Sequence, residues 1–457
     1  MLFNDFRFLF VFLPVVLALF FVPGAHRLRG VMLLLASLGF YASSGVEHAA
    51  VLCACIVWVF AVTWSPRFVG NRALLALAVA GPAAALFHYK YLGFFVRDVL
   101  GLSAGASPAL FSLFGSIVLP AGISFFTFEL VSYAVDRYRG QIPERPGFVR
   151  FALFVSFFPH LIAGPILRYR DVAASLAALP VFRLARQDAS AGIAYITLGL
   201  ASKVLVADSL HHAIAPLVAK PGALGSVASL YVLFAYSFQI YFDFYGYSLV
   251  AIGLARLFGF RFPANFDRPY ESPNPKVFWR RWNITLSYWI RDYLYRPLGG
   301  NERYARNILI VFALCGLWHG AGWTFVIWGL YHAALVILYK ATARWWDRPP
   351  LLVQRTLTFV LATLGWMLFL FDFHGIQAFA PSLIGLGTGT VPSPDMAQWL
   401  LLLAAGAVCF GLRFEAMAER LDVAGLASYA RTAAFSALFV AMLLFIDRSQ
   451  TFIYFRF

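Results

Sequence analysis

Residues 276–332 read KVFWRRWNITLSYWIRDYLYRPLGGNERYARNILIVFALCGLWHGAGWTFVIWGLYH, a polar and aromatic stretch that runs directly into an apolar span. The apolar span carries His319. An ionisable side chain at bilayer depth is costly unless it faces a cavity or a partner group. We therefore expect the rest of the chain to hold His319 in place and to bring two substrates to it.

The composition is that of a membrane protein. Of the 457 residues, 61% are hydrophobic and 12% are charged, whereas soluble domains are about one quarter charged. We predict an all-α polytopic membrane protein that forms a single domain over residues 1–457, with about 11 to 13 membrane segments of about 20 mostly apolar residues each. The candidate spans are residues 6–23, 31–45, 48–65, 73–89, 109–135, 148–166, 190–207, 228–258, 307–340 (two short passes), 352–373, 396–412 and 430–447.

The net charge of +15 fits a membrane surface better than a nucleic acid. Basic residues of membrane proteins gather in cytoplasmic loops and contact anionic lipid headgroups. We therefore expect contacts with membrane lipids and no nucleic-acid partner. Basic loops at 24–30 and 66–72 place the N-terminus outside the cytoplasm. The first span lacks a basic start and a cleavage site, so we expect it to be retained.

Several chemistries have no support in the sequence. The four cysteines lie in apolar runs without a CxxC pair, and no HExxH motif occurs. Neither a disulfide framework nor a metal site is indicated. A serine-nucleophile elbow, a P-loop and a dinucleotide fingerprint are also missing from the sequence.

Proline and glycine interrupt two apolar stretches, at residues 119–122 and 158–165. Broken helices are tolerated at membrane depth where the freed backbone is buried in protein or lines a cavity. We therefore expect broken or re-entrant helices around a central tunnel, with His160 of the second break lining it.

Residues 256–306 hold ten basic and four acidic side chains. Aromatic and apolar residues recur every three or four positions between 278 and 293, which predicts a helix with one aromatic-apolar face. Arg280, Asn283, Ser287 and Arg291 fall on another face. Guanidinium groups pair well with phosphate, so this segment is suited to a coenzyme's phosphates or to lipid headgroups, and both interpretations stay open.

Candidate functional side chains stand out within the apolar spans. Glycines flank His319, which is either a histidine hydrogen-bonded near a helix end or a base that removes a hydroxyl proton. His332 is a secondary candidate, for which a helix-end or interface position is preferred. Gln239 and Asp243 lie one helical step apart and either bind substrate or pair internally with an arginine.

Short motifs follow one another along almost the whole chain: MLFN (1–4), LPAGISF (119–125), VDRYRG (135–140), FFPHLIAGP (157–165), KVLVAD (203–208), QIYFDF (239–244), FWRRW (278–282), RDY (291–293), PLGG (297–300), LWHG (317–320) and FIYF (452–455). In this order they resemble the membrane-bound O-acyltransferase family, specifically its bacterial branch that contains alginate O-acetyltransferase.

This resemblance implies roles for two residues. His319 takes the place of the family's catalytic histidine, and Asn283 takes a second signature position where bacterial members usually carry histidine. An amide can orient a substrate or donate to a developing oxyanion, but it cannot act as a base. The residues that we expect to bind substrate or line the tunnel are His332, His160, Gln239, Asp243, Arg280, Arg281 and Trp318.

The resemblance also implies the substrates. We expect acetyl-CoA as the cytoplasmic acyl donor, no bound cofactor, and a hydroxyl of an extracytoplasmic polysaccharide as the acceptor. A periplasmic acetyltransferase is expected as a partner if transfer is relayed, and the expected location is the bacterial inner membrane. The alternative is a non-enzymatic transporter or an inactive scaffold of a polysaccharide export complex, although no inverted repeat supports a transporter.

Overall fold

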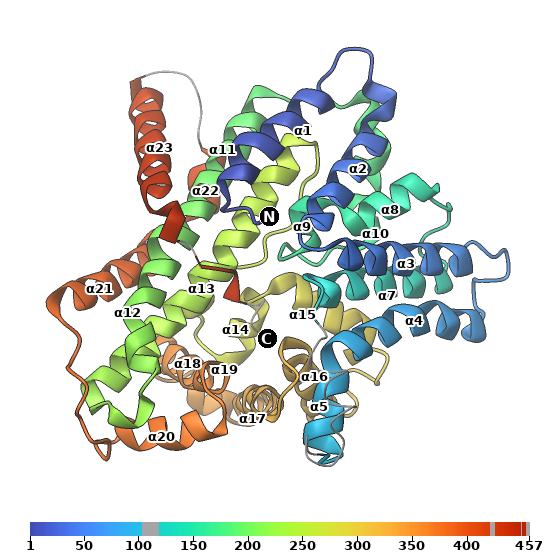
Figure 1. Cartoon of the computed structure of the whole chain (residues 1–457). Coiled ribbons are helices and arrows are strands. Elements are labelled where there is room, and N and C mark those ends of the chain that lie inside the picture. The colour runs from blue at the N-terminus through green and yellow to red at the C-terminus, as the bar shows by residue number, and fades with distance from the viewer. Residues whose placement is uncertain (103–117, 421–425, 449, 454–457) are drawn as a thin grey trace. The chain divides into compact units, whose positions relative to one another are not determined.

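The structure is a computed structural model that describes residues 1–102, 118–420, 426–448 and 450–453. Over these residues the chain is helical without a β-strand (Figure 1), which confirms the all-α class. It forms two compact units, Met1–Ile193 with Ala251–Pro263 and Ala194–Val250 with Ala264–Phe457. The prediction of one domain over residues 1–457 concerns both units together and stays a prediction.

The first unit consists of the helices of the N-terminal part, of which α3, α4 and α7 pack against one another (Figure 1). Its elements, with η for 3-10 and π segments, are η1 (Phe8–Phe12), α1 (Leu13–Phe20), η2 (His26–Leu28), α2 (Arg29–Ala42), α3 (Val46–Thr63), α4 (Arg72–Leu86), η3 (Phe87–Tyr91), α5 (Leu92–Phe94), η4 (Phe95–Val99), α7 (Ile123–Tyr138), α8 (Phe148–Ser156), α9 (Phe158–Leu161), α10 (Tyr169–Ala178), η5 (Leu179–Val181) and the first half of α11 (Arg186–Ala201).

Both predicted helix breaks lie in this unit; the second is confirmed, and the first stays a prediction because the residues before it lie outside the described ones. Gly122 adopts a left-handed φ of 76° immediately before α7. A Cβ at this position would lie 2.3 Å from the carbonyl oxygen of Leu161, so only glycine fits there. The second stretch forms α8 and α9 instead of one span. Residues 109–117 of the predicted span 109–135 lie outside the described residues.

The second unit holds the chemistry-bearing segment. Its elements are the end of α11, η6 (Ser202–Ala207), α12 (Asp208–Val218), η7 (Pro221–Ala223), most of α13 (Ser226–Leu257), η8 (Pro269–Glu271), α14 (Pro275–Arg281), α15 (Ile284–Ile290), η9 (Arg291–Tyr295), α16 (Tyr304–His319), α17 (Trp323–Trp346), α18 (Leu351–Gly365), α19 (Met367–Leu370), α20 (Phe373–Leu383), α21 (Met396–Gly411), α22 (Phe414–Glu419), α23 (Leu426–Phe445) and η10 (Ile446–Arg448).

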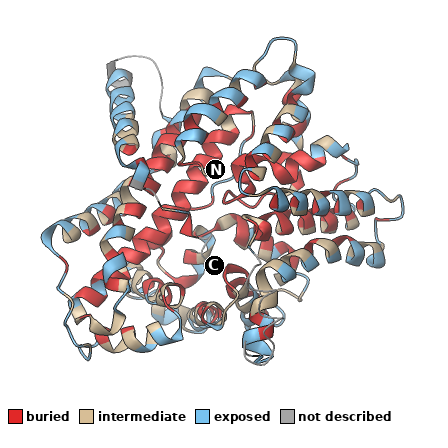
Figure 2. Ribbon diagram, viewed as in Figure 1, coloured by how far each residue is buried: buried red, intermediate tan, exposed pale blue. Residues whose placement is uncertain are grey.

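The helices differ in how far their apolar residues are buried. In the most apolar window of α13, 83% of the residues are buried, against 11% for Arg72–Val99. Figure 2 shows the same contrast between the buried α13 and the exposed α23. An apolar helix that remains exposed is suited to face lipid.

Six helical segments of the described residues are long and apolar enough to span a membrane, and four apolar helices are shorter. The long segments are Val46–Thr63, Arg72–Val99, Arg186–Val218, Ser226–Leu257, Trp323–Trp346 and Leu351–Leu370. The shorter ones are Phe8–Phe20, Tyr304–His319, Met396–Gly411 and Tyr429–Phe445. The chain is therefore a multi-pass membrane protein, whereas the predicted tunnel through it stays a prediction.

Candidate active site

His319 lies at the turn of a tight helical hairpin. It is the last residue of α16, and Gly320 to Gly322 lead directly into α17. A Cβ at Gly316 would lie 2.1 Å from the carbonyl oxygen of Phe325, and a Cβ at Gly329 would lie 2.0 Å from that of Phe312. The two glycines therefore permit a backbone contact that no larger residue allows, and this contact fixes His319.

Aromatic rings enclose the imidazole of His319, whose residue is 2% exposed. Its ring centroid lies 4.8 Å from that of Trp318, 5.1 Å from that of Trp328 and 5.4 Å from that of Phe369. A neutral imidazole in such surroundings can accept a proton from a hydroxyl. The predicted base therefore lies in an enclosed aromatic site. Trp318 contacts it, and the predicted place of Trp318 in a substrate site or tunnel stays a prediction.

Asn283 occupies a strained connection between α14 and α15. Its φ is 43° and its ψ is 59°, a left-handed conformation in which asparagine is enriched among residues other than glycine. The residue is 1% exposed. Neither Oδ1 nor Nδ2 has a hydrogen-bond partner among the described residues. A buried amide without partners is available to a ligand.

Asn265 accepts the hydrogen bonds that hold this connection between α14 and α15 in place. The carbonyl oxygen of Asn265 accepts from the backbone N–H of Ile284 at 2.9 Å. Asn265 Oδ1 accepts from the backbone N–H of Thr285 at 3.2 Å and from its hydroxyl at 2.9 Å. Trp282 is buried beside Asn283 and packs on Trp366 with centroids 4.9 Å apart.

The predicted helix over 278–293 is thus broken in two at residues 282–283. The residues of the predicted aromatic-apolar face, Phe278, Trp282, Leu286, Trp289 and Tyr293, are all buried. The placement of Asn283 on the polar face with Arg280 and Arg291 was wrong, because both arginines are exposed and Asn283 is buried. The physical reason is the left-handed residue, which turns the chain and resets the helical register.

His332 of α17 also contacts Trp328. Its ring centroid is 5.0 Å from those of Trp328 and Trp279, and its ring stacks on Phe278 at 6.2 Å. The residue is 1% exposed. Both histidines of the hairpin therefore contact the same indole. A position of His332 at a helix end, which the sequence favoured, was wrong, because His332 lies in the interior of α17.

Gln239 and Asp243 of α13 are occupied by internal contacts. Asp243 Oδ1 lies 2.8 Å from Lys203 Nζ, and Asp243 Oδ2 accepts from the backbone N–H of Ile453 at 2.7 Å. Gln239 Nε2 lies 3.2 Å from Nδ1 of His211. The internal pairing considered for Asp243 therefore exists, with a lysine in place of an arginine.

His160 belongs to the first unit. Its Nδ1 lies 2.9 Å from Glu129 Oε1, and both side chains are buried. Glu129 Oε1 also accepts from the backbone N–H of Leu167 at 3.4 Å. This pair gives His160 a structural role in its own unit, and its predicted place in a tunnel stays a prediction.

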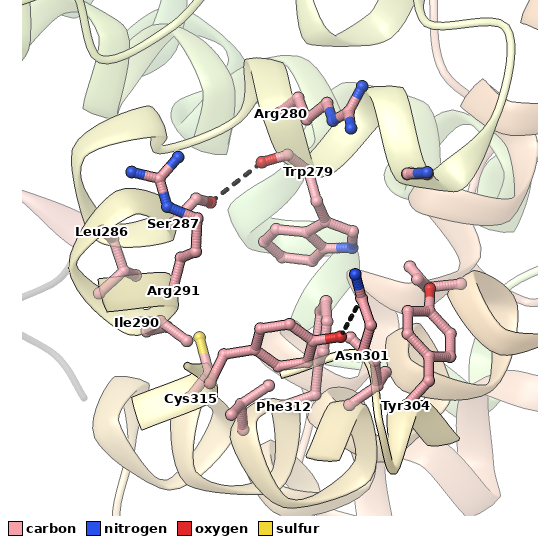
Figure 3. Close-up of a pocket in the computed structure, with 15 residues that line it drawn as sticks. Trp279, Arg280, Leu286, Ser287, Ile290, Arg291, Asn301, Tyr304, Phe312 and Cys315 are labelled. Atoms are coloured by element: carbon pink, nitrogen blue, oxygen red, sulfur yellow. Dashed lines mark hydrogen bonds between the residues drawn. The ribbon is translucent and has the colours of Figure 1, made fainter. Parts of the chain in front are cut away.

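A cavity of about 340 Å³ in the second unit runs beside α16 (Figure 3). Three exposed cations line it, and Figure 3 shows the indole of Trp279 extending from α14 into it. From Tyr304 to Cys315 the lining follows α16 over eleven residues, or about 16 Å at 1.5 Å per residue. We call this cavity the α16 pocket; it is lined by Lys276, Trp279, Arg280, Leu286, Ser287, Ile290, Arg291, Tyr295, Asn301, Tyr304, Ile308, Val311, Phe312, Cys315 and Val336.

Two polar groups of the α16 pocket have a fixed protonation state. The hydrogen bonds from Arg291 to Asp292 raise the pKa of the guanidinium, which therefore stays cationic. Burial raises the pKa of Tyr295, so its phenol stays protonated and donates to Asn301 Oδ1 at 2.8 Å. Arg291 is thus a fixed cation of the pocket at neutral pH, and Tyr295 and Asn301 are held in place by their hydrogen bond.

Arg281 does not line the α16 pocket. It lines a second cavity of about 500 Å³ in the same unit, together with Arg268, Arg355 and Arg413 and with three acidic side chains. Its own nearest carboxylate is that of Asp267, at 4.0 Å. Three carboxylates offset the arginines there, whereas in the α16 pocket one carboxylate, that of Asp292, pairs with Arg291, so the α16 pocket is the better candidate for a polyanionic ligand.

Comparison with known proteins identifies the family. The model of the membrane-bound O-acyltransferase family matches residues 110–384, which is more than half of the chain. The chain belongs to the membrane-bound O-acyltransferase family. It is therefore an O-acyltransferase, an enzyme that transfers an acyl group to a hydroxyl, and the resemblance seen in the sequence is confirmed.

Curated relatives place the chain within this family. It is 38% identical over 387 residues to the probable alginate O-acetylase AlgI of Pseudomonas syringae pv. tomato, covering 81% of this chain and 72% of the relative. It is 32% identical over 415 residues to the peptidoglycan O-acetyltransferase of Helicobacter pylori, covering 81% of this chain and 77% of the relative. It is 30% identical over 255 residues to the teichoic acid D-alanyltransferase of Bacillus subtilis, covering 53% of this chain and 64% of the relative.

Sequence reasoning missed part of the site of this O-acyltransferase. Trp328 lies four residues before His332 on α17, so helical spacing alone could have placed both rings on one face. Phe369 contacts His319 from fifty residues further along the chain, and no local pattern indicates such a contact. Asn265 lies in a loop and acts through backbone hydrogen bonds that the sequence does not reveal.

Proposed function

We propose that this O-acyltransferase moves an acetyl group from acetyl-CoA, taken up from the cytoplasm, to a hydroxyl of an extracytoplasmic polysaccharide. The names of two relatives support the acetyl group and the glycan acceptor, because one is a probable alginate O-acetylase and the other a peptidoglycan O-acetyltransferase. We place the enzyme in the bacterial inner membrane, where a cytoplasmic donor and an outer acceptor can be reached by one protein.

The observation that carries the proposal is the lining of the α16 pocket. It includes Lys276, Arg280 and Arg291, whose charges suit the phosphates of coenzyme A. Its lining ends on α16 at Cys315, which lies one helical turn before His319. A donor with its phosphates among the cations and its acyl end pointing along α16 would therefore present the thioester toward His319.

His319 then acts as the base. Its imidazole accepts the proton of the acceptor hydroxyl while the hydroxyl oxygen attacks the carbonyl carbon of the thioester. The amide of Asn283 is buried and without an internal partner, and we assign it to the negative charge on the carbonyl oxygen of the tetrahedral intermediate. When the carbon–sulfur bond breaks, the imidazolium returns its proton to the coenzyme A thiolate, which leaves an O-acetyl ester and free coenzyme A.

The route to the polysaccharide is either direct or relayed. In a relay the first acceptor is a hydroxyl of a periplasmic acetyltransferase, which passes the acetyl group to the glycan. Both routes need the same base and the same donor pocket. They differ only in which hydroxyl reaches His319, so one assay separates them.

The test uses the full chain in proteoliposomes with acetyl-CoA labelled in the acetyl group. Oligomannuronate and a peptidoglycan fragment serve as acceptors. We expect His319→Gln to lower acetyl transfer or thioester hydrolysis by about 10²- to 10⁴-fold, the usual contribution of a general base. His374→Gln is the matched control, because His374 is an exposed histidine on α20.

Each outcome decides a part of the proposal. Label on a glycan indicates direct transfer, and thioester hydrolysis without a labelled glycan indicates the relay. Full activity of His319→Gln would show that His319 is not the base of the reaction. If the wild-type protein neither hydrolyses acetyl-CoA nor transfers its acetyl group, acetyl-CoA is not the donor. This result would support the alternative of an inactive scaffold or a transporter.

A further inference from the structure

Three nitrogen-bearing rings of the second unit meet beside the α16 pocket. Trp279 comes from α14, and Trp328 and His332 come from α17. The ring centroids are 5.5 Å apart for the two tryptophans, and each lies 5.0 Å from His332. All three contacts are steeply inclined, at 67° to 86°. We call these three rings the nitrogen triad.

Each ring of the nitrogen triad has a buried nitrogen without a hydrogen-bond partner among the described residues: Nε1 of Trp279, Nε1 of Trp328 and Nε2 of His332. An indole N–H is a donor and never an acceptor. Leaving such a donor buried and unpaired is costly, and a buried polar group normally has a partner. The partner that the two indoles lack is therefore a hydrogen-bond acceptor.

Other indoles of this unit show that the lack of a partner is specific to the triad. Trp366 packs against Trp328 with centroids 5.7 Å apart, yet its Nε1 donates to the hydroxyl of Tyr270 at 3.1 Å. Trp346 at the end of α17 donates to the carbonyl oxygen of Pro273 at 2.9 Å. The protein thus satisfies neighbouring indoles internally and leaves those of the triad unsatisfied.

The position of the triad points to the ligand. Trp279 lines the α16 pocket, so a ligand in the pocket touches the triad first through this ring. Trp328 contacts His319, with centroids 5.1 Å apart. The triad therefore connects Trp279 in the lining of the α16 pocket with Trp328 beside the proposed base, His319.

We propose that the nitrogen triad binds a carbonyl oxygen of the acyl donor. The proposal rests on the proposed function, since it takes the acetyl-CoA of the α16 pocket as the ligand. Two kinds of carbonyl on this donor offer the required acceptor, namely the amides of the pantetheine arm and the thioester. In either case the triad positions the donor.

The experiment measures dissociation constants of the full-length protein in detergent for acetyl-CoA and for S-ethyl-CoA, a thioether that keeps the amides and lacks the thioester carbonyl. Trp279→Phe and Trp328→Phe remove the N–H groups and keep an aromatic ring. We expect each to weaken acetyl-CoA binding about three- to tenfold, as the loss of one uncharged hydrogen bond predicts. Trp366→Phe is the matched control, because it loses an internal bond and should bind as the wild type.

S-ethyl-CoA distinguishes the two carbonyls. Equal weakening for both ligands assigns the triad to a pantetheine amide, and weakening for acetyl-CoA alone assigns it to the thioester. If both variants bind acetyl-CoA as tightly as the wild type does, the inference is wrong while the proposed function stands. If the wild type itself binds neither ligand, the proposed donor is wrong and the inference falls with it. Should Trp328→Phe not fold, Trp279→Phe decides, since Trp279 is only half-buried.

Discussion

At the scale of single residues, Asn283 has a proposed role at the oxyanion and also a left-handed backbone conformation that few residue types adopt. Its φ of 43° costs most residues about 1–2 kcal/mol, and glycine nothing. Asn283→Gly should therefore fold with an unchanged melting temperature and lose about 10²- to 10³-fold in the rate of acetyl transfer, the usual effect of removing an oxyanion donor. The measurements are a thermal melt and the proteoliposome assay.

Two further variants separate the backbone from the amide. Asn283→Val should fail to fold or melt much lower, because β-branched residues rarely adopt a left-handed φ. Asn283→His should fold, since histidine tolerates this region. An active Asn283→Gly would show that the amide takes no part in the reaction.

The two signature residues differed in how far the sequence revealed them. His319 stood out because an ionisable group is rare inside an apolar span, and the structure buries it as that reasoning requires. The burial of Asn283 could not be predicted in the same way. Helical periodicity placed it on a polar face, and only the left-handed turn at 282–283 brings it inside.

At the scale of elements, the contact between α16 and α17 determines where His319 lies. Gly329→Ala introduces a Cβ at 2.0 Å from the carbonyl oxygen of Phe312, so the two helices must separate. Forcing extra volume into a packed contact typically costs about 1–3 kcal/mol. We expect a lower melting temperature and a lower acetyl-transfer rate, because displacement of α17 also moves the rings around His319.

Gly39→Ala is the matched control for this variant. Gly39 also lies inside a helix, α2, but a Cβ there has no neighbour within 4 Å. Alanine is the better helix former by about 1 kcal/mol, so the melting temperature should stay equal or rise. Equal melting of both variants would show that the glycine contact does not fix the hairpin.

The long helices could be predicted from composition, and the short ones could not. Apolar stretches such as 228–258 and 307–340 became α13 and the α16–α17 pair, and the two short passes of the second stretch are separated at residues 320–322. The helices α10 and α20 were not predicted, because they are shorter than a membrane span. Their residues gain helical structure from packing in the folded protein, which a search for long apolar runs does not detect.

At the scale of the whole molecule, charge predicts how the enzyme is oriented. The loop between α2 and α3 has no lysine or arginine, and the loop between α3 and α4 carries Arg67. By the positive-inside rule the first loop lies outside the cytoplasm and the second inside. We take the side of the α16 pocket that is lined by Lys276, Arg280 and Arg291 as its mouth. It belongs to the most basic part of the chain, so we expect it to face the cytoplasm, where acetyl-CoA is made.

Cysteine labelling of intact cells tests this orientation. The four native cysteines are first replaced by alanine, and Ser44→Cys, Arg67→Cys and Lys276→Cys are then made singly, all at exposed positions. A membrane-impermeant maleimide should label Ser44→Cys in intact cells, and the other two only after permeabilisation. Labelling of Lys276→Cys from outside would put the pocket mouth in the periplasm, where a coenzyme A thioester cannot be supplied, and the donor assignment would then be wrong. Protection of Lys276→Cys by added acetyl-CoA in permeabilised cells would in turn locate the donor at this mouth.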